Sequence, residues 1–188
     1  MTIDKSDILA QASSALLQGD KSSAADIINT HYQFVPIENP GRKYTENQML
    51  QIFKRDGFID RYSGQRLVFP GMLRLFSRIL PETFPAHPNW KMSETHIAFW
   101  ELFPTIDHVI PIARGGADDE SNWVTTSMVR NSAKSSWLLE ELDWQLLPTG
   151  SLTAWDGLLA SFIQLLKQDT SHLSDTYIKK WYAAALKP

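Results

Sequence analysis

Four side chains between residues 105 and 136 have the chemistry to bind a cation and to activate water. Asp107 and His108 are adjacent, Asn122 follows 14 residues after His108, and Asn131 follows 9 residues after Asn122. Carboxylate and amide oxygens are the ligands that hard divalent cations prefer, and an imidazole can serve as a general base near neutral pH. The segment therefore predicts a site that holds a divalent cation by oxygen and leaves an imidazole free.

The order and spacing of these residues resemble the HNH endonuclease motif. That motif consists of Asp-His, an apolar residue, any residue and Pro, then a Gly-rich loop, a central Asn and a final His or Asn on a helix. The corresponding residues here are Asp107-His108-Val109-Ile110-Pro111, Gly115-Gly116, Asn122 and Asn131. The resemblance is strong over about 30 residues. It implies a ββα-metal fold and phosphodiester hydrolysis in DNA.

The resemblance assigns a role to each of the four residues. His108 is expected to be the general base, because an imidazole with a pKa near 6.5 accepts a proton from water at neutral pH. Asn122 is expected to orient that imidazole through its amide oxygen. Asp107 and Asn131 are expected to bind one Mg²⁺ or Mn²⁺ ion by oxygen. For each residue, a purely structural role is the competing interpretation.

The elements that must position these side chains agree with the motif. The family fold places one strand at 105–110, its antiparallel partner at 122–126 and a crossing helix at 127–135. Alternation along a strand puts Asp107 and His108 on opposite faces. The expected class is α+β and mostly helical, with a ββα-metal core.

Many members of the family hold a structural zinc ion with two pairs of Cys, and this chain contains no Cys. Aligned on Gly64 and Asn131, the four positions are occupied by Asp60, Ser63, Ser127 and Arg130. No structural zinc is therefore expected. One hypothesis is that an ion pair between Asp60 and Arg130 replaces it.

The chain carries a net charge of −3, which argues against a large nucleic-acid surface. Residues 40–91 are the exception, with nine Lys or Arg and four Asp or Glu, a balance of +5. Phosphate contacts are expected from this block and from Lys134, Arg114 and Arg130. The alternative is that these cations only solvate a surface.

The 188 residues suit a small catalytic core with helical additions. We expect an N-terminal helical hairpin at 1–40, the HNH core at 41–146 and C-terminal helices at 147–188 that pack on the core. A capping box at Thr45–Gln48 opens one predicted helix. Periodicity and capping residues predict the other helices at 7–17, 22–32, 72–80, 153–167 and 174–186, with a loop at Pro36, Pro40 and Gly41.

Composition limits the setting of the protein. There is no apolar run near 18 residues, no basic and apolar leader, and no disulfide framework, so a cytoplasmic protein without membrane contact is expected. DNA is the expected partner, and a homodimer or a larger system is possible. Two alternatives remain: a catalytically silent nucleic-acid-binding module with the same fold, and a helical protein-interaction module.

Overall fold

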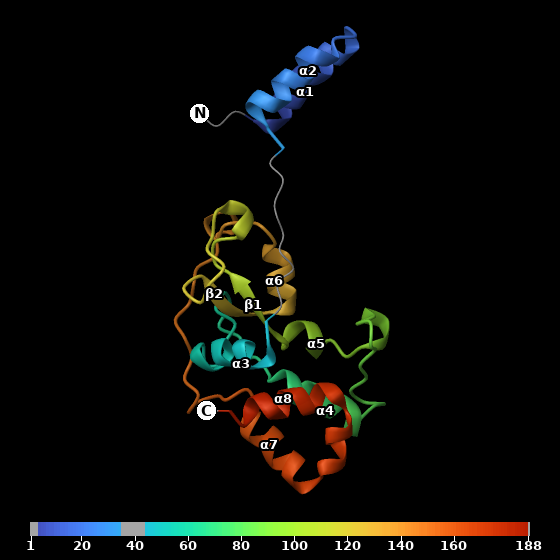
Figure 1. Ribbon diagram of the computed structural model, residues 1–188, viewed down its shortest axis with the longest axis vertical. Coiled ribbons are helices and arrows are strands. Elements are labelled where there is room, and N and C mark those ends of the chain that lie inside the picture. Colours follow the sequence, from blue (N-terminus) through green and yellow to red (C-terminus); the bar gives the residue numbers. More distant parts are fainter. Residues whose placement is uncertain (1–3, 35–43, 188) are drawn as a thin grey trace. The chain divides into compact units, whose positions relative to one another are not determined.

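The computed structural model describes residues 4–34 and 44–187. The chain divides into two compact units, one up to Arg42 and one from Lys43 onward (Figure 1). The predicted loop at Pro36, Pro40 and Gly41 and the predicted domain boundary lie outside the described residues.

The N-terminal unit is a pair of helices, α1 (Lys5–Leu17) and α2 (Lys21–His31). Asp4 caps α1 by accepting the Ser6 N–H at 2.9 Å, and Asp20 caps α2 by accepting the Ser23 N–H at 2.9 Å. The predicted first residues were Asp7 and Ser22, so α1 begins two residues earlier and α2 one residue earlier than predicted. An aspartate just upstream has the same capping chemistry.

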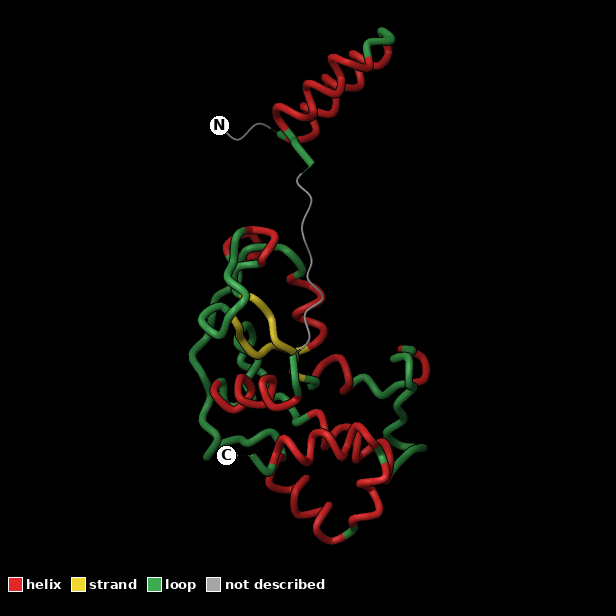
Figure 2. The backbone as a smooth tube through the Cα atoms, viewed as in Figure 1, coloured by secondary structure: helices red, strands yellow, loops and turns green. Residues whose placement is uncertain are grey.

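A two-stranded antiparallel sheet lies at the centre of the second unit (Figure 2). Strand β1 (Pro104–His108) pairs with β2 (Trp123–Ser127), so that Asp107 is opposite Val124 and His108 is opposite Trp123. Helix α6 (Met128–Lys134) follows directly, capped by the Ser127 hydroxyl. The expected mostly helical α+β class is confirmed, although β1 is shorter than predicted and β2 begins one residue later.

Helix α3 (Glu46–Arg55) begins where the sequence indicates. Thr45 and Gln48 form the reciprocal capping box, and the helix turns Leu50, Ile52 and Phe53 into the core. It packs against β2 and the C-terminal helix α8. The prediction for this helix is confirmed because its start signal and its apolar spacing are both local.

The remaining helices of this unit share one core, rich in aromatic side chains, with α3. Phe69 contacts Phe162 and Trp181 with ring centroids 4.9 and 5.3 Å apart. The helices are α4 (Pro70–Ile79), α5 (Ala98–Glu101), α7 (Leu159–Gln168) and α8 (Thr176–Ala185). Short 3₁₀ helices occur at Met92–Glu94, Ile112–Arg114, Glu140–Leu142 and Thr170–Ser174. None of the helices in the described part of the chain is long and apolar enough to cross a membrane.

Helix α7 is shorter than the predicted helix at 153–167. Gly157 and Leu158 have φ of +71° and +66°, which breaks a right-handed helix. A Cβ at Gly157 would collide with the Phe58 ring, so the close packing requires glycine. Trp155 still reaches the core from the preceding turn, where its Nε1 donates to the Leu67 carbonyl at 2.7 Å.

Candidate active site

Asp107 lies at the buried junction of β1 and α6. Its Oδ2 accepts hydrogen bonds from the Tyr62 hydroxyl at 2.7 Å and from Lys134 Nζ at 3.0 Å. Burial raises the pKa of Tyr62 and the negative charge of Asp107 raises it further, so the phenol stays protonated and donates. One oxygen of Asp107 is thus held firmly by two donors.

Lys134 is fully buried, contrary to the expected phosphate contact. Its ammonium also donates to the His108 carbonyl at 2.7 Å, so it ties α6 to the end of β1. A buried Lys needs an anionic partner, and Asp107 supplies it. The prediction that Lys134 touches DNA is therefore corrected to an internal role.

Asn131 also faces β1, one turn before Lys134 on α6. Its Nδ2 donates to Thr105 Oγ1 at 3.0 Å and to the Ile106 carbonyl at 3.1 Å. These bonds fix the amide beside the strand that carries Asp107. Among the described residues, no hydrogen bond is found to Asn131 Oδ1 or to Asp107 Oδ1.

These two oxygens are the part of the site that suits a divalent cation. No cluster of three or more His, Cys, Asp or Glu that could hold a metal occurs within residues 4–34 and 44–187. The expected ligand pair contains a single carboxylate and an amide, which is a weak site until phosphate oxygens complete the coordination. The donor set fits Mg²⁺ or Mn²⁺ and leaves most coordination positions to substrate and water.

His108 is buried at the end of β1, and its Nε2 lies 2.7 Å from Asp118 Oδ1. Trp123 Nε1 lies 3.0 Å from the same imidazole nitrogen and 3.2 Å from the same carboxylate oxygen. His108 Nε2 cannot donate to Asp118 and accept from Trp123 at the same time. We therefore assign the proton to Nε2, so that His108 Nε2–H and Trp123 Nε1–H both donate to the Asp118 carboxylate. In this tautomer Nδ1 keeps the basic lone pair. No hydrogen bond or ion pair joins the imidazole to Asp107 or Asn131 in the part of the chain described.

Asp118 is the partner of His108 that the sequence did not identify. The hydrogen bond from His108 lowers the pKa of the Asp118 carboxyl, and the N–H of Trp123 and the hydroxyl of Tyr44 add to the effect. In the sequence it is one of three consecutive acidic residues in a loop, and nothing local distinguishes it from Asp119 or Glu120.

Asn122 clamps the loop between the strands and does not reach the imidazole. Its Oδ1 accepts the Ile110 N–H at 2.9 Å, while its Nδ2 donates to the carbonyls of Ile110 and Ala117, each at 2.8 Å. A Cβ on Gly116 would overlap the Ile110 carbonyl and the Asn122 amide. The expected bond to His108 is corrected: Asn122 shapes the loop that presents Asp118.

Asp60 is one of the four residues at the positions where the resemblance would place zinc-binding Cys. Its Oδ1 accepts the Tyr62 N–H and its Oδ2 accepts the Ser127 N–H, both at 2.9 Å. Arg130 Nε lies 4.0 Å from Oδ2, so the hypothesised ion pair is present. A buried carboxylate thus joins the 60–64 turn to the corner of β2 and α6.

Asp56 makes a second buried cross-link, which the sequence analysis did not anticipate. Its Oδ2 accepts the Thr125 N–H at 2.7 Å, and its Oδ1 accepts from Arg55 and Arg61, each at 3.0 Å. Asp56 therefore fixes the end of α3 to β2. Two arginines of the basic block at 40–91 are thus paired with this one residue, Arg61 largely buried and Arg55 still 39 % exposed.

The other predicted phosphate contacts are also engaged within the chain. Arg114 Nη2 bonds both oxygens of Glu141 at 2.9 and 3.1 Å, and the Arg130 guanidinium lies 5.4 Å from the Trp144 ring centroid. Their side chains remain 40 % and 38 % exposed, respectively. Both guanidinium groups are thus partly exposed while each already contacts a side chain of the protein.

Comparison with known proteins supports the identification of the motif. Residues 99–127 match the HNH endonuclease family. The match runs from α5 to the end of β2, includes Asp107, His108 and Asn122, and ends before Asn131. It confirms the resemblance over that segment and indicates a nuclease-type function. No curated protein and no solved structure matches the chain.

Proposed function

We propose that this protein is a metal-dependent endonuclease that hydrolyses phosphodiester bonds in DNA. The observation that carries the proposal is the pair Asp107 and His108 at the end of β1. Within residues 4–34 and 44–187, no hydrogen bond is found to Asp107 Oδ1 or to His108 Nδ1. They lie in the segment that matches the nuclease family.

His108 acts as the general base in this proposal. Asp118 holds the Nε2–H at 2.7 Å, which fixes the tautomer and leaves Nδ1 to accept a proton from the attacking water. The negative charge of Asp118 stabilises the imidazolium that forms. Asn122 supports the reaction indirectly, because it holds the loop from which Asp118 extends.

Asp107 and Asn131 would hold one Mg²⁺ or Mn²⁺ ion through their two open oxygens. When bound, the cation would neutralise charge on the phosphorane and assist the departing 3′ oxygen. Lys134 and Tyr62 hold the Asp107 side chain in place through its other oxygen. Asn131 is kept in place by its bonds to β1.

DNA is the substrate that we propose, with one strand cut at each site. A single motif gives a single reaction centre, so cleavage of both strands requires a second copy or two encounters. Arg114 and Arg130, which are both partly exposed, would bind the DNA backbone. Lys134 is buried and would not. The absence of cysteine fits a reducing, cytoplasmic setting.

A plasmid-nicking assay tests the proposal. Supercoiled plasmid is incubated with the purified protein in Mg²⁺, in Mn²⁺ and in EDTA. We expect nicking with metal, none in EDTA, and a loss of about 100-fold or more for His108→Ala. His172→Ala is the matched control, since His172 pairs with Asp169 away from the motif. Equal nicking by wild type and His108→Ala would assign the activity to a contaminant and reject the proposal.

One observation favours a second candidate, a catalytically silent nucleic-acid-binding or interaction module. The Lys134 ammonium lies 3.0 Å from Asp107 and already balances its charge without a metal ion. This candidate predicts DNA binding that is independent of Mn²⁺ and unchanged in His108→Ala, with no nicking. A gel-shift titration beside the plasmid assay separates the two candidates.

A further inference from the structure

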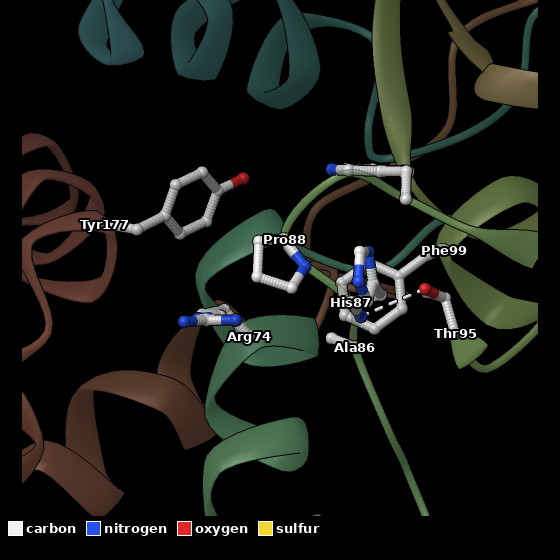
Figure 3. A pocket seen from close by; sticks show the side chains of 8 residues that line it. Arg74, Ala86, His87, Pro88, Thr95, Phe99 and Tyr177 are labelled. Atoms are coloured by element: carbon white, nitrogen blue, oxygen red, sulfur yellow. Dashed lines mark hydrogen bonds between the residues drawn. The ribbon is translucent and has the colours of Figure 1, made fainter.

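A cavity of about 210 Å³ lies between α4, the segment 86–95, α5 and α8 (Figure 3). Its walls include three aromatic side chains: Trp90, Phe99 and Tyr177. Pockets for drug-sized ligands occupy roughly 300–1,000 Å³. This cavity therefore suits one planar ring system and not an extended ligand.

Trp90, Phe99 and Tyr177 form the aromatic wall of the cavity, and neighbouring residues hold it in place. Trp90 has φ of +53°, an unfavourable backbone for a bulky residue, and its ring contacts Phe99 at 5.5 Å and Phe103 at 5.0 Å. Such outliers persist where packing fixes them and are frequent at binding sites. Desolvation raises the pKa of Tyr177 to about 12, although 37 % of the residue is accessible. Its hydroxyl is therefore neutral and does not repel an anion.

A more open groove of about 460 Å³ adjoins the cavity and shares Arg74 and His87 with it. Arg74 is paired with Asp175 at 2.9 Å. Arg78 lines the groove and donates to Ser174 Oγ at 2.9 Å, and no carboxylate within 4.0 Å of its guanidinium is found in the described residues. Glu94, the acidic residue found in the lining, is 3.2 Å from Lys91 and 3.7 Å from His87.

We infer that the cavity and its groove bind a nucleotide, with the base against the aromatic wall and the phosphate over Arg78. Base stacking on aromatic side chains contributes about 1–3 kcal/mol, and a guanidinium with unused N–H groups is a strong phosphate donor. The nucleotide is either a free mononucleotide or an unpaired nucleotide of a strand. The second source rests on the proposed function; the first does not.

Calorimetric titration of the full chain without divalent metal tests the inference. The probes are AMP, CMP, a short oligo(dT), adenosine, ribose 5-phosphate and inorganic phosphate. We expect AMP, CMP or oligo(dT) to bind at least tenfold more tightly than ribose 5-phosphate or inorganic phosphate. Binding of the mononucleotides identifies the free nucleotide as ligand, whereas binding of oligo(dT) alone identifies the strand. If no probe exceeds inorganic phosphate, the inference is wrong.

Two variants separate the ring site from the phosphate site. Arg78→Gln should weaken nucleotide binding about tenfold and leave adenosine unaffected, because only the phosphate contact is lost. Lys179→Gln removes the same charge from an exposed position outside the two linings and should change nothing. Ala86→Leu narrows the cavity and should weaken the nucleotide and adenosine alike, with circular dichroism as the check on folding. Equal affinity of Arg78→Gln and wild type for nucleotides overturns the inference.

These outcomes are independent of catalysis. His108→Ala should bind the nucleotide as the wild type does, because His108 lies on β1 outside both linings. A protein that nicks plasmid and binds no nucleotide contradicts only this inference. A protein that binds mononucleotides and does not nick contradicts only the proposed function.

Discussion

Three buried carboxylates contact the β1–β2 hairpin or belong to it, and they differ in how many of their oxygens accept hydrogen bonds from the protein. Asp56 and Asp60 each accept hydrogen bonds from protein donors with both oxygens. Asp107 uses Oδ2 alone among the described residues. The same type of side chain therefore cross-links two segments in one place, and in the other it keeps one oxygen without a hydrogen bond from the described residues.

The difference has a simple energetic basis. A buried carboxylate is stable when its lone pairs meet N–H groups and cations, and removing it then leaves those donors unsatisfied. Asp56 and Asp60 each join two segments of the fold, because Asp56 accepts the Thr125 N–H and Asp60 accepts the Ser127 N–H. Asp107 is only partly satisfied, which is the arrangement that the proposed role as a cation ligand requires.

The largest effect is expected for Asp56→Ala. The change leaves the Thr125 N–H unsatisfied, and Arg61 loses its buried partner. We expect a loss of about 3–5 kcal/mol in the free energy of unfolding, measured by urea denaturation. Asp119→Ala, at an exposed loop carboxylate, is the control and should leave the free energy of unfolding nearly unchanged. Similar losses for both would show that Asp56 is not a structural cross-link.

The affinity for Mn²⁺ should depend on Asp107 and not on Asp60. In a His108→Ala background with bound duplex DNA, Asp107→Asn is expected to weaken Mn²⁺ binding at least tenfold, because it removes the only carboxylate of the proposed pair. Asp60→Asn should leave the affinity unchanged. Electron paramagnetic resonance of free Mn²⁺ measures both, at a temperature where each variant is folded. Equal Mn²⁺ affinity for the two variants contradicts the ligand assignment.

Gly116→Ala should disturb the loop that links the two strands. The new Cβ would overlap the Ile110 carbonyl and the Asn122 amide, so we expect a loss of about 1–3 kcal/mol and weaker nicking. Gly115→Ala is the comparison, since no atom lies within 4 Å of its Cβ position and only its φ of +86° is strained. The Asn122 clamp should survive there, and nicking should be retained. If Gly115→Ala abolishes nicking and Gly116→Ala does not, the clamp is not what matters.

The smallest effect is expected for Asp118→Asn and depends on pH. His108 lowers the pKa of Asp118 in the folded protein below the ordinary value of about 3.9, so the ionised carboxylate favours folding above that value. The contribution is lost as the pH falls through the folded-state pKa. Because the side chain is 42 % exposed, we expect less than about 1 kcal/mol near pH 7. Thermal unfolding of both proteins from pH 7 to pH 2 measures it, and a constant difference over that range contradicts the hydrogen bond from His108 to the Asp118 carboxylate.

Much of the fold could be predicted because its signals are local. The capping box at Thr45 fixes the start of α3, and strand alternation correctly separates the partners of Asp107 from those of His108. The start of α7 could not be predicted, because it depends on how closely Gly157 approaches Phe58, far away in the sequence. Likewise, Asp118 could not be distinguished from its acidic neighbours before the loop was folded.

By itself, the sequence determined the ββα segment, the adjacent carboxylate and imidazole, and the absence of a cysteine zinc site. Only the tertiary structure decided that Lys134 points inward to Asp107, that Asn122 bonds the loop, and that Asp118 meets the imidazole. The reason is physical: spacing fixes which face a residue occupies, but its partner depends on which distant element covers that face. A long polar side chain takes the partner that satisfies its charge once water is excluded.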